Sequence, residues 1–372
     1  MFDKSKRIIC GIVVFLVFAI GAVSVQASFA PKMLNREVYY ETKEYQEYYS
    51  YLFSLKPKSL IRKVNDIFVN KNAIKGDNIY IAVGVLMERI NEFESSMIMS
   101  AIMDEKKDPD YRSALIQLVC ENKDPSELVE LISLLKASTT DENIRVSIIH
   151  QYPHTEDTKE LLTELVYDDN NRVAYHSLNK LYNIDRKLGL ELAYRVYEQT
   201  INSEENPTLP LKAALQILSY DYSIDNIASL KNGSFISKPE QEEFIDECIK
   251  IIENNLFNLK DSAFYDMCNI IHPKAIKYIM DSDNISNSKK TFAVNMNFLP
   301  LEYIITNDES ENNILLFCKA TALRPFEKFK EIIGNISTEK LSLKCVETID
   351  SIKSMSSVGE YEIHYNYKLI DR

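Results

Sequence analysis

Apolar residues recur every three or four positions along most of the chain after residue 35, with polar residues between them. This spacing places the apolar side chains on one face of an α-helix, whereas a strand would alternate them. Outside the central segment described below, the pattern predicts helices at 36–55, 58–70, 77–93, 95–106, 239–257, 261–271, 273–281, 289–306, 311–322, 325–333 and 338–354. Only 8 glycines and 11 prolines interrupt the 372 residues, too few for a chain of short strands and tight turns. The sequence therefore predicts an all-α fold.

A short phrase, D-x-[DN]-x-R, occurs three times in the central segment, each time before an apolar-periodic run. Its aspartate and arginine are Asp108 and Arg112, then Asp141 and Arg145, then Asp168 and Arg172. A second aspartate follows the first by 16, 16 and 17 residues, and each opens a further apolar helix: Asp124, Asp157 and Asp185. Two phrases repeated three times in one order indicate a stack of helix pairs, each packing on its neighbours.

The residues of both phrases suit the start of a helix. A carboxylate there accepts hydrogen bonds from the free N–H groups of the first turn and opposes the positive end of the helix dipole. Asp124, Asp157 and Asp185 are therefore predicted helix caps, and Asp157 with Glu160 has the form of a capping box. An arginine in the first turn is unfavourable to the dipole. We expect the three arginines to pair with acidic or capping residues, which would give a structural ladder along the stack; anion binding is the alternative role.

The run from Leu161 to Leu178, a Leu-rich helix followed by an acidic turn, an arginine and small or apolar residues, resembles the HEAT-like repeats of the armadillo-type superfamily. The resemblance covers Asp108 to Tyr197. Successive units start 33 and 27 residues apart, and the glycine common between such units is missing. The resemblance implies a right-handed α-solenoid, a superhelix of stacked helix pairs.

The flanking segments continue this pattern more weakly. A fourth unit has Lys212 in place of the arginine and Asp225, 13 residues later, at the expected start of its second helix. No linker rich in Ser, Pro or Gly divides the chain, so we expect one extended domain. Its predicted segments are a signal peptide or anchor at 1–27, capping helices at 36–107, HEAT-like repeats at 108–230, degenerate helical repeats at 231–358 and a tail at 359–372.

The N-terminus has the features of an export signal. Lys4, Lys6 and Arg7 precede an apolar stretch at 8–25, and small residues permit cleavage after Ala27. The stretch is also nearly long enough to remain as a membrane anchor. Both alternatives place the rest of the chain outside the cytoplasm, secreted or anchored by residues 8–25. The Ile, Asn and Lys bias is typical of an AT-rich bacterium.

Tyrosines gather at both ends of the chain. One predicted helix holds six tyrosines, which indicates either a capping helix with partly exposed aromatic packing or an adhesive or membrane-facing surface: Tyr39, Tyr40, Tyr45, Tyr48, Tyr49 and Tyr51. In the tail, Tyr361, Ile363, Tyr365 and Tyr367 alternate with polar residues, which is the period of a strand. The tail is predicted to be a short strand, a disordered segment or an edge offered to another chain.

Candidate chemistry is sparse. His150 and His154 flank Pro153, so they do not share a helix face in the way that two zinc ligands would, and no third ligand has supporting spacing. No nucleophile, phosphate-binding or dinucleotide motif occurs. Cys120, Cys248, Cys268, Cys318 and Cys345 lie among apolar residues and are predicted to be buried free thiols. We therefore expect no catalytic residue, no metal and no cofactor.

Charge and repeat architecture together favour a binding protein. With 43 basic and 55 acidic residues the net charge is -12, which gives no general reason to bind nucleic acid or an anionic membrane. The acidic excess favours a basic partner or the buffering of cell-wall cations, and a solvated acidic face is the simpler alternative. We expect a non-catalytic scaffold for an unknown protein or peptide, with membrane contact only through the N-terminal segment. An enzyme with a site in the irregular segment 231–372, or a purely structural spacer, is the alternative.

Overall fold

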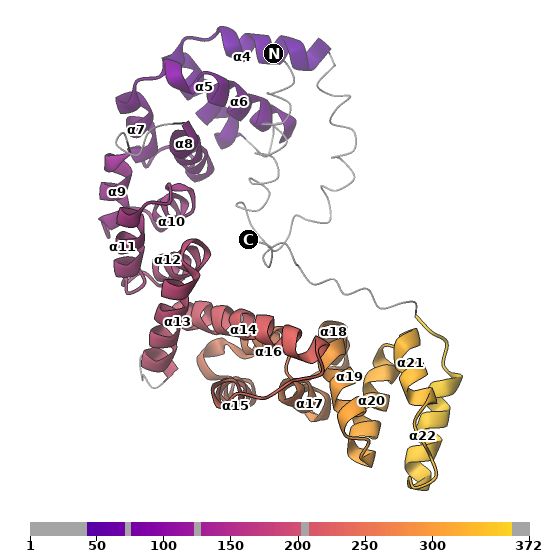
Figure 1. Ribbon diagram of the computed structural model, residues 1–372. Helices are drawn as coiled ribbons and strands as arrows, with labels where there is room; N and C mark the ends of the chain where they lie inside the picture. Colours follow the sequence, from indigo (N-terminus) through magenta and orange to yellow (C-terminus); the bar gives the residue numbers. More distant parts are fainter. Residues whose placement is uncertain (1–42, 71–75, 123–127, 202–207, 359–372) are drawn as a thin grey trace. The chain divides into compact units, whose positions relative to one another are not determined.

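A computed structural model describes residues 43–70, 76–122, 128–201 and 208–358 of the protein (Figure 1). The predicted signal or anchor segment, Asp124 and the Tyr-rich tail with its possible strand lie outside these residues. The described residues form nineteen α-helices and no strand, which confirms the all-α prediction. None of these helices combines the length and the apolar character that a membrane crossing requires.

The chain forms two compact units, residues 1–162 and 163–372. The division falls within α11 (Glu156–Leu165). Each unit is an assembly of helices that pack mainly on their near neighbours in the chain, as a helical repeat requires.

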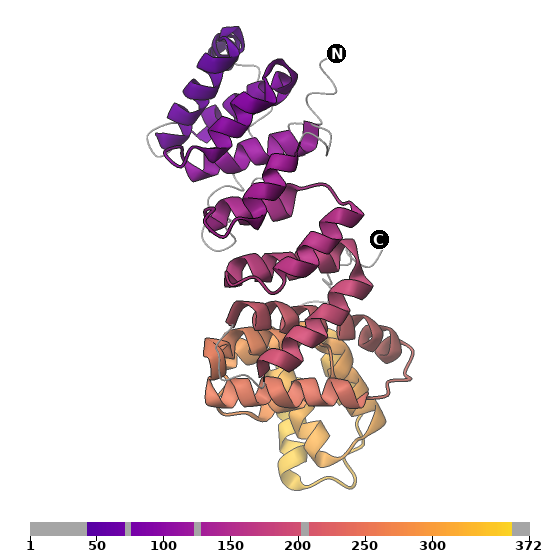
Figure 2. The same ribbon diagram turned by 90° about the vertical axis from the view of Figure 1, so that its left-hand side faces the viewer.

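Unit 1 begins with helices that lie before the repeated phrases. It contains α4 (Lys43–Ser54), α5 (Pro57–Val69), α6 (Gly76–Glu88), the 3₁₀ turn η1 (Ile90–Glu92), α7 (Ser95–Met103), α8 (Pro109–Asn122), α9 (Val129–Lys136) and α10 (Glu142–Gln151). Helix α8 packs on α5, α7 and α10, and α10 packs on α9. Figure 2 shows these helices side by side.

Unit 2 holds two alternating rows of helices. The first row, here called the even row, is α12 (Asn171–Ile184), α14 (Thr208–Lys231), α16 (Lys260–Asn269), α18 (Asn287–Met296), α20 (Glu311–Leu323) and α22 (Leu343–Ser354). The odd row is α13 (Arg186–Ile201), α15 (Pro239–Asn254), α17 (Pro273–Asp281), α19 (Phe298–Asn307) and α21 (Glu327–Gly334), with the 3₁₀ turn η3 (Leu256–Asn258) after α15.

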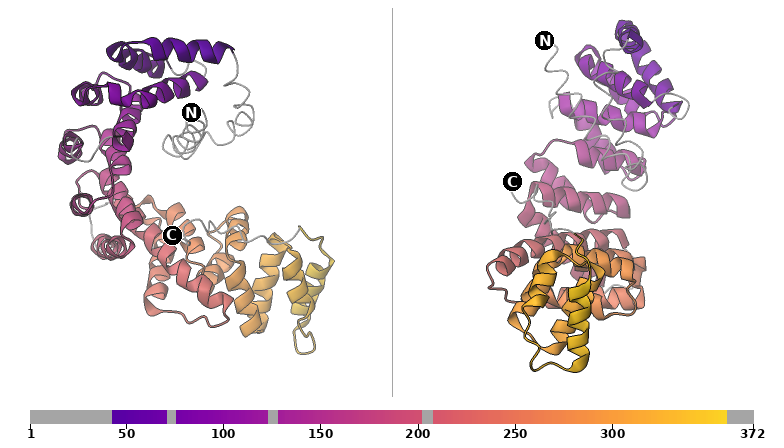
Figure 3. Two further views of the ribbon diagram at one scale, coloured as in Figure 1. Left: turned by 45° about the horizontal axis from the view of Figure 1, so that its top comes forward. Right: turned by 90° about the vertical axis from the view of Figure 1, so that its right-hand side faces the viewer.

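The even row is continuous, because each of its helices packs on the next. In the odd row, α15 packs on α17 and α17 on α19. Figure 1 shows α14 and α18 along one side of the unit and α15 and α17 along the other. The right-hand view of Figure 3 looks onto the C-terminal end, with α21 and α22 in front. Residues 239–354 thus alternate between the two rows in chain order.

Apolar faces of both rows meet in the core. Phe244, Phe264, Phe298, Phe317 and Phe329 are all buried, and burial of such a side chain contributes about 1.5–3 kcal/mol. The closest approach is at Gly189 of α13, where a Cβ atom would lie 2.3 Å from the Cα of Tyr182 in α12. Only glycine lets these two helices approach so closely.

Two predicted helix boundaries differ from the structure. The fourth unit was expected to start a new helix at Asp225, but α14 runs through that residue without a break. No Gly or Pro stands between Leu211 and Lys231 to end the helix, so the helical hydrogen bonds continue. Conversely, the single helix expected at 289–306 is two helices, because buried Asn297 ends α18 and starts α19.

Candidate binding surface

The aspartates of the first phrase lie at helix starts. Asp108 Oδ1 accepts hydrogen bonds from the backbone N–H groups of Asp110 and Tyr111, 2.9 and 3.3 Å away, at the start of α8. Asp141 accepts in the same way from Asn143 and Ile144 at the start of α10. In the third copy, however, Asn170 caps α12, and Asp168 accepts from the N–H of Asn170 instead.

The arginines of the first two copies donate to backbone carbonyls. Arg112 Nε donates to the carbonyl oxygen of Ile102, 2.6 Å away, and Arg145 Nε donates to that of Leu135, 2.8 Å away. Both guanidinium groups are buried, and both acceptors lie in the last turn of the preceding helix, where carbonyls have no helical partner. One acceptor of each guanidinium is thus the negative end of the preceding helix, which suits a cation. The acid–arginine ladder stays a prediction. Arg172 is half-buried.

Sequence reasoning missed a third arginine of this kind. Arg89 is buried, and its Nη1 donates to the carbonyl oxygens of Phe53 and Leu55 at the end of α4, 2.8 and 2.7 Å away. Its Nε and Nη2 donate to Glu92. Arg89 follows α6 rather than opening a helix, so the repeated phrase gave no signal for it.

Of the aspartates of the second phrase, Asp185 caps its helix as predicted and Asp157 does not. Asp185 Oδ1 accepts from the N–H of Leu188, 3.1 Å away, at the start of α13. Asp157 is not the cap of α11, because this helix begins at Glu156 and Thr155 Oγ1 accepts from the N–H of Thr158, 3.1 Å away. A threonine two residues earlier competes for the same N–H group, and the capping position takes only one side chain.

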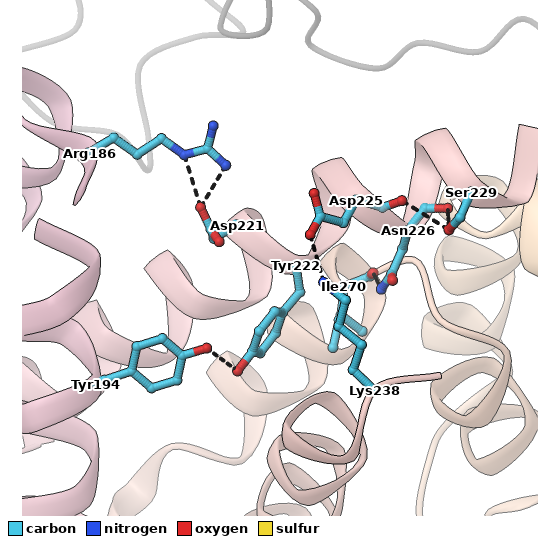
Figure 4. A network of polar contacts seen from close by, with 9 residues as sticks. All are labelled: Arg186, Tyr194, Asp221, Tyr222, Asp225, Asn226, Ser229, Lys238 and Ile270. Carbon is cyan, nitrogen blue, oxygen red and sulfur yellow. Dashed lines mark hydrogen bonds and ion pairs between the residues drawn. The ribbon is translucent and has the colours of Figure 1, made fainter. Parts of the chain in front are cut away.

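A polar network fastens α13, α14 and the following segment together (Figure 4). Arg186 forms an ion pair with Asp221 at 2.7 Å, and Lys238 forms one with Asp225 at 3.0 Å. The hydroxyl oxygens of Tyr194 and Tyr222 lie 2.5 Å apart. Burial raises the pKa of Tyr222 far above its ordinary value, and the hydrogen bond with Tyr194 adds to this effect. These groups are engaged with one another, which assigns the network a structural role.

The segment 232–238 between α14 and α15 is held on its inner side by His272. Ser237 Oγ lies 2.9 Å from His272 Nε2, and the N–H of Lys274 donates to His272 Nδ1 at the start of α17. The ring of Phe235 packs edge-on against His272 and Tyr303. Burial lowers the pKa of His272 to about 4. The neutral imidazole is therefore the form that fits this position, with Nδ1 as acceptor.

A second buried titratable group lies within the even row. Asp266 of α16 is 3 % exposed, and Ser219 of α14 donates to its Oδ1 over 3.4 Å. Its Oδ2 has no hydrogen-bond partner among the described residues. Burial raises the pKa of this carboxyl to about 7, although Ser219, Lys212 and Ser262 each counteract the rise.

Four side chains form two contacting pairs on neighbouring helices of the even row, and one of the four, Tyr265, directly precedes Asp266 in the chain. We call them the aromatic row: Tyr175 of α12, Gln216 of α14, Tyr265 of α16 and Phe292 of α18. Tyr175 donates to Gln216 Oε1 over 3.3 Å, and the rings of Tyr265 and Phe292 meet edge to face with centroids 5.4 Å apart. Tyr265 is 46 % exposed and Phe292 39 %. Periodicity could not identify these residues, because the same positions would suit a buried helix face.

The N-terminal tyrosines pack along α4. Tyr45 stacks on Tyr49, and Tyr49 on Phe53, while Tyr51 and Phe53 remain 48 % and 43 % exposed. The Tyr49 hydroxyl donates to Glu88 of α6. Partly exposed aromatic packing at the end of a unit is thus present, and Tyr39 and Tyr40 lie outside the described residues.

Groups that could bind a metal do not converge in the described part of the chain. No cluster of three His, Cys, Asp or Glu side chains occurs there. His150 is in the last turn of α10, and His154 follows in the connection to α11. The five cysteines in that part of the chain are buried and form no disulfide bond there, as predicted.

Comparison with known proteins gives no relative from which a role could be transferred. No protein-family model, curated protein or solved structure matches this chain.

Proposed function

We propose that this chain is an exported repeat protein of the HEAT-like, right-handed solenoid type that binds a protein or peptide and catalyses no reaction. The aromatic row carries the proposal. Tyr265 and Phe292 lie on neighbouring helices and keep 46 % and 39 % of their surface exposed, although ring–ring contact already covers part of each. Exposed aromatic side chains on a rigid surface are typical of protein-binding sites.

The rigidity of the support favours the same role. Each helix below the aromatic row packs on the next. A surface that is ordered before binding loses less conformational entropy when a partner docks.

The site of action is proposed from the N-terminal sequence. The basic residues before the apolar stretch 8–25 and the cleavage position after Ala27 support export, with secretion or anchoring as the two outcomes. The intact mass of the exported protein tests this: a chain that starts at Ser28 shows cleavage, and a chain that retains residues 1–27 shows an anchor. Protein found only in the cytoplasm would contradict the proposal.

Site-specific photo-cross-linking tests the binding role. A photo-reactive residue at position 292 should give an adduct of one defined mass, and Tyr265→Ala should abolish it. A probe at Leu256, which is equally exposed at 39 %, is the matched control and should give no such adduct. Equal cross-linking at both positions would show that the aromatic row is not a binding surface.

An enzyme with its site in residues 231–372 remains the alternative, and Asp266 is the observation in its favour. Carboxyl groups with a pKa near 7 are frequent in active sites because they exchange protons at neutral pH. A catalytic Asp266 must reach substrate, so it should react with a water-soluble carbodiimide in the folded protein. Protection of Asp266 from this reagent would count against the enzyme.

A further inference from the structure

The two rows of unit 2 differ in charge. The even row contains ten basic and seven acidic residues, whereas the odd row contains eight basic and twelve acidic residues. The contrast is largest between α18, which has Lys289 and Lys290 and no acidic residue, and α15, which has one basic and six acidic residues. The even row is thus net positive within a chain of net charge -12.

Cations of the even row lie close to the aromatic row. Lys289 Nζ is 5.1 Å from the ring centroid of Phe264, whose ring in turn contacts both Tyr265 and Phe292. Lys289 also forms an ion pair with Asp261. Lys212 lies near enough to Asp266 to lower the pKa of that carboxyl, and it forms no ion pair with a described residue. Lys212 is half-buried, where a charge is less screened than on an open surface.

A hydrogen-bond donor completes the surface. Gln216 accepts from Tyr175 through Oε1, which leaves the N–H groups of its side-chain amide as donors. Its Nε2 makes no hydrogen bond within the described residues, and the side chain is exposed. Lys212 lies one turn before Gln216 on α14, so both side chains share one face of this helix. An ammonium group and an amide donor side by side match a carboxylate.

We propose that the aromatic row binds an acidic peptide segment that also carries an aromatic or aliphatic side chain. The peptide carboxylate meets Lys212 and Gln216, and its apolar side chain packs on Tyr265 and Phe292. This inference rests on the proposed binding function and reverses the basic partner expected from the total charge, because binding depends on the local field rather than on the net charge.

A nucleic acid or an anionic membrane fits this surface less well. Each would need several unpaired cations in sequence, whereas Lys289 is paired with Asp261 and Lys319 with Asp281. Lys212 is the one cation beside the aromatic row that forms no ion pair with a described residue. Most of the binding free energy must therefore come from contact with the aromatic side chains. A peptide with few carboxylates and an apolar side chain satisfies both conditions.

Binding of synthetic copolymers by the full chain tests the proposal. The probes are a random Glu–Tyr copolymer, a Lys–Tyr copolymer of the same length, a single-stranded oligonucleotide and vesicles with anionic lipid. We expect the Glu–Tyr copolymer to bind most tightly. Lys212→Gln and Phe292→Ala should each weaken this binding at least about fivefold, since each removes roughly 1 kcal/mol or more of contact.

Matched variants distinguish the possible failures. Tyr167→Ala removes a tyrosine that is 50 % exposed outside the aromatic row, and Lys250→Gln removes a lysine of the odd row; neither should change the affinity. Thermal unfolding shows whether each variant is folded. Preferential binding of the Lys–Tyr copolymer, lost in Phe292→Ala, would overturn the acidic partner and leave the binding function intact. Tighter binding of the oligonucleotide or vesicles would overturn the peptide, and affinities that none of the variants changes would overturn the proposed binding surface as well.

Discussion

The buried guanidinium of Arg145 donates from Nε to the carbonyl oxygen of Leu135, 2.8 Å away, and so joins the first turn of α10 to the last turn of α9. A positive charge is unfavourable at the start of its own helix but favourable at the end of the preceding one. The same arrangement joins Arg112 of α8 to Ile102 of α7. In these two copies of the repeated phrase the arginine thus ties the start of one helix to the end of the preceding helix.

Replacement of Arg145 by methionine should destabilise unit 1 by about 2–4 kcal/mol. The substitution keeps much of the side-chain volume but leaves a buried carbonyl without its donor. Urea denaturation followed by circular dichroism measures the change in the free energy of unfolding. Arg195→Met is the control, because Arg195 forms an exposed ion pair with Glu191 and its loss should cost less than about 0.5 kcal/mol. Equal effects of the two substitutions would contradict this role of Arg145.

Two glycine-to-alanine substitutions should act in opposite directions. Gly189→Ala places a Cβ atom 2.3 Å from the Cα of Tyr182, which forces α12 and α13 apart, and overpacking of this kind costs about 1–3 kcal/mol or more. Gly84→Ala in α6 meets no atom within 4 Å and should stabilise by up to about 1 kcal/mol, because alanine favours the helix. Thermal unfolding of both variants checks the signs. A stabilising Gly189→Ala would show that the two helices separate without cost.

Asp266→Asn should stabilise the protein at pH 8 and change it little at pH 4. Folding raises the pKa of Asp266 from its ordinary value near 4 to about 7, so the unfolded chain loses this proton at lower pH than the folded chain. The contribution of Asp266 to the free energy of unfolding therefore decreases as the pH rises from about 4 to about 7, and then stays constant. The full difference is on the order of 4 kcal/mol. Unfolding of wild type and variant across this pH range measures it, and parallel curves would contradict the prediction.

His272→Asn should reduce the loss of stability in mild acid. Burial lowers the pKa of His272 from 6.5 to about 4, so the unfolded chain binds a proton first as the pH falls. The stabilisation provided by neutral His272 is complete above pH 6.5 and is lost as the pH falls towards 4. Asparagine also caps helices through a side-chain oxygen but has no proton to gain in this range.

As the pH rises from 4 to 6.5, the contribution of Asp266 to the free energy of unfolding decreases and that of His272 increases. The Asp266→Asn variant should therefore be compared with the double variant that carries Asp266→Asn and His272→Asn. If both proteins then lose stability equally in acid, His272 is not the group responsible.

Particular residues show how far sequence reasoning reaches. Asp108, Asp141 and Asp185 accept hydrogen bonds from N–H groups within three residues, so the local sequence was enough to place them. The prediction that Asp157 caps α11 was wrong because Thr155, which is equally close in the chain, accepts the hydrogen bond of the first turn. The prediction of a new helix at Asp225 was wrong because a residue that can cap a helix does not end the preceding one when no Gly or Pro interrupts it. The acceptors of Arg112 and Arg145 belong to other helices, which a local pattern does not specify.

The sequence by itself determined that the described chain is helical and where several of its helices begin, since apolar periodicity and capping depend on residues within one or two turns. Only the tertiary structure decided which side chains lie on the surface of the even row and which carboxyl is buried beneath it. Ser219 and Asp266 are 47 residues apart in the chain, and Tyr175 and Gln216 are 41 apart. The proton affinity of Asp266 and the exposure of the aromatic row depend on such distant neighbours, because burial and electric field arise from every helix that packs around a group.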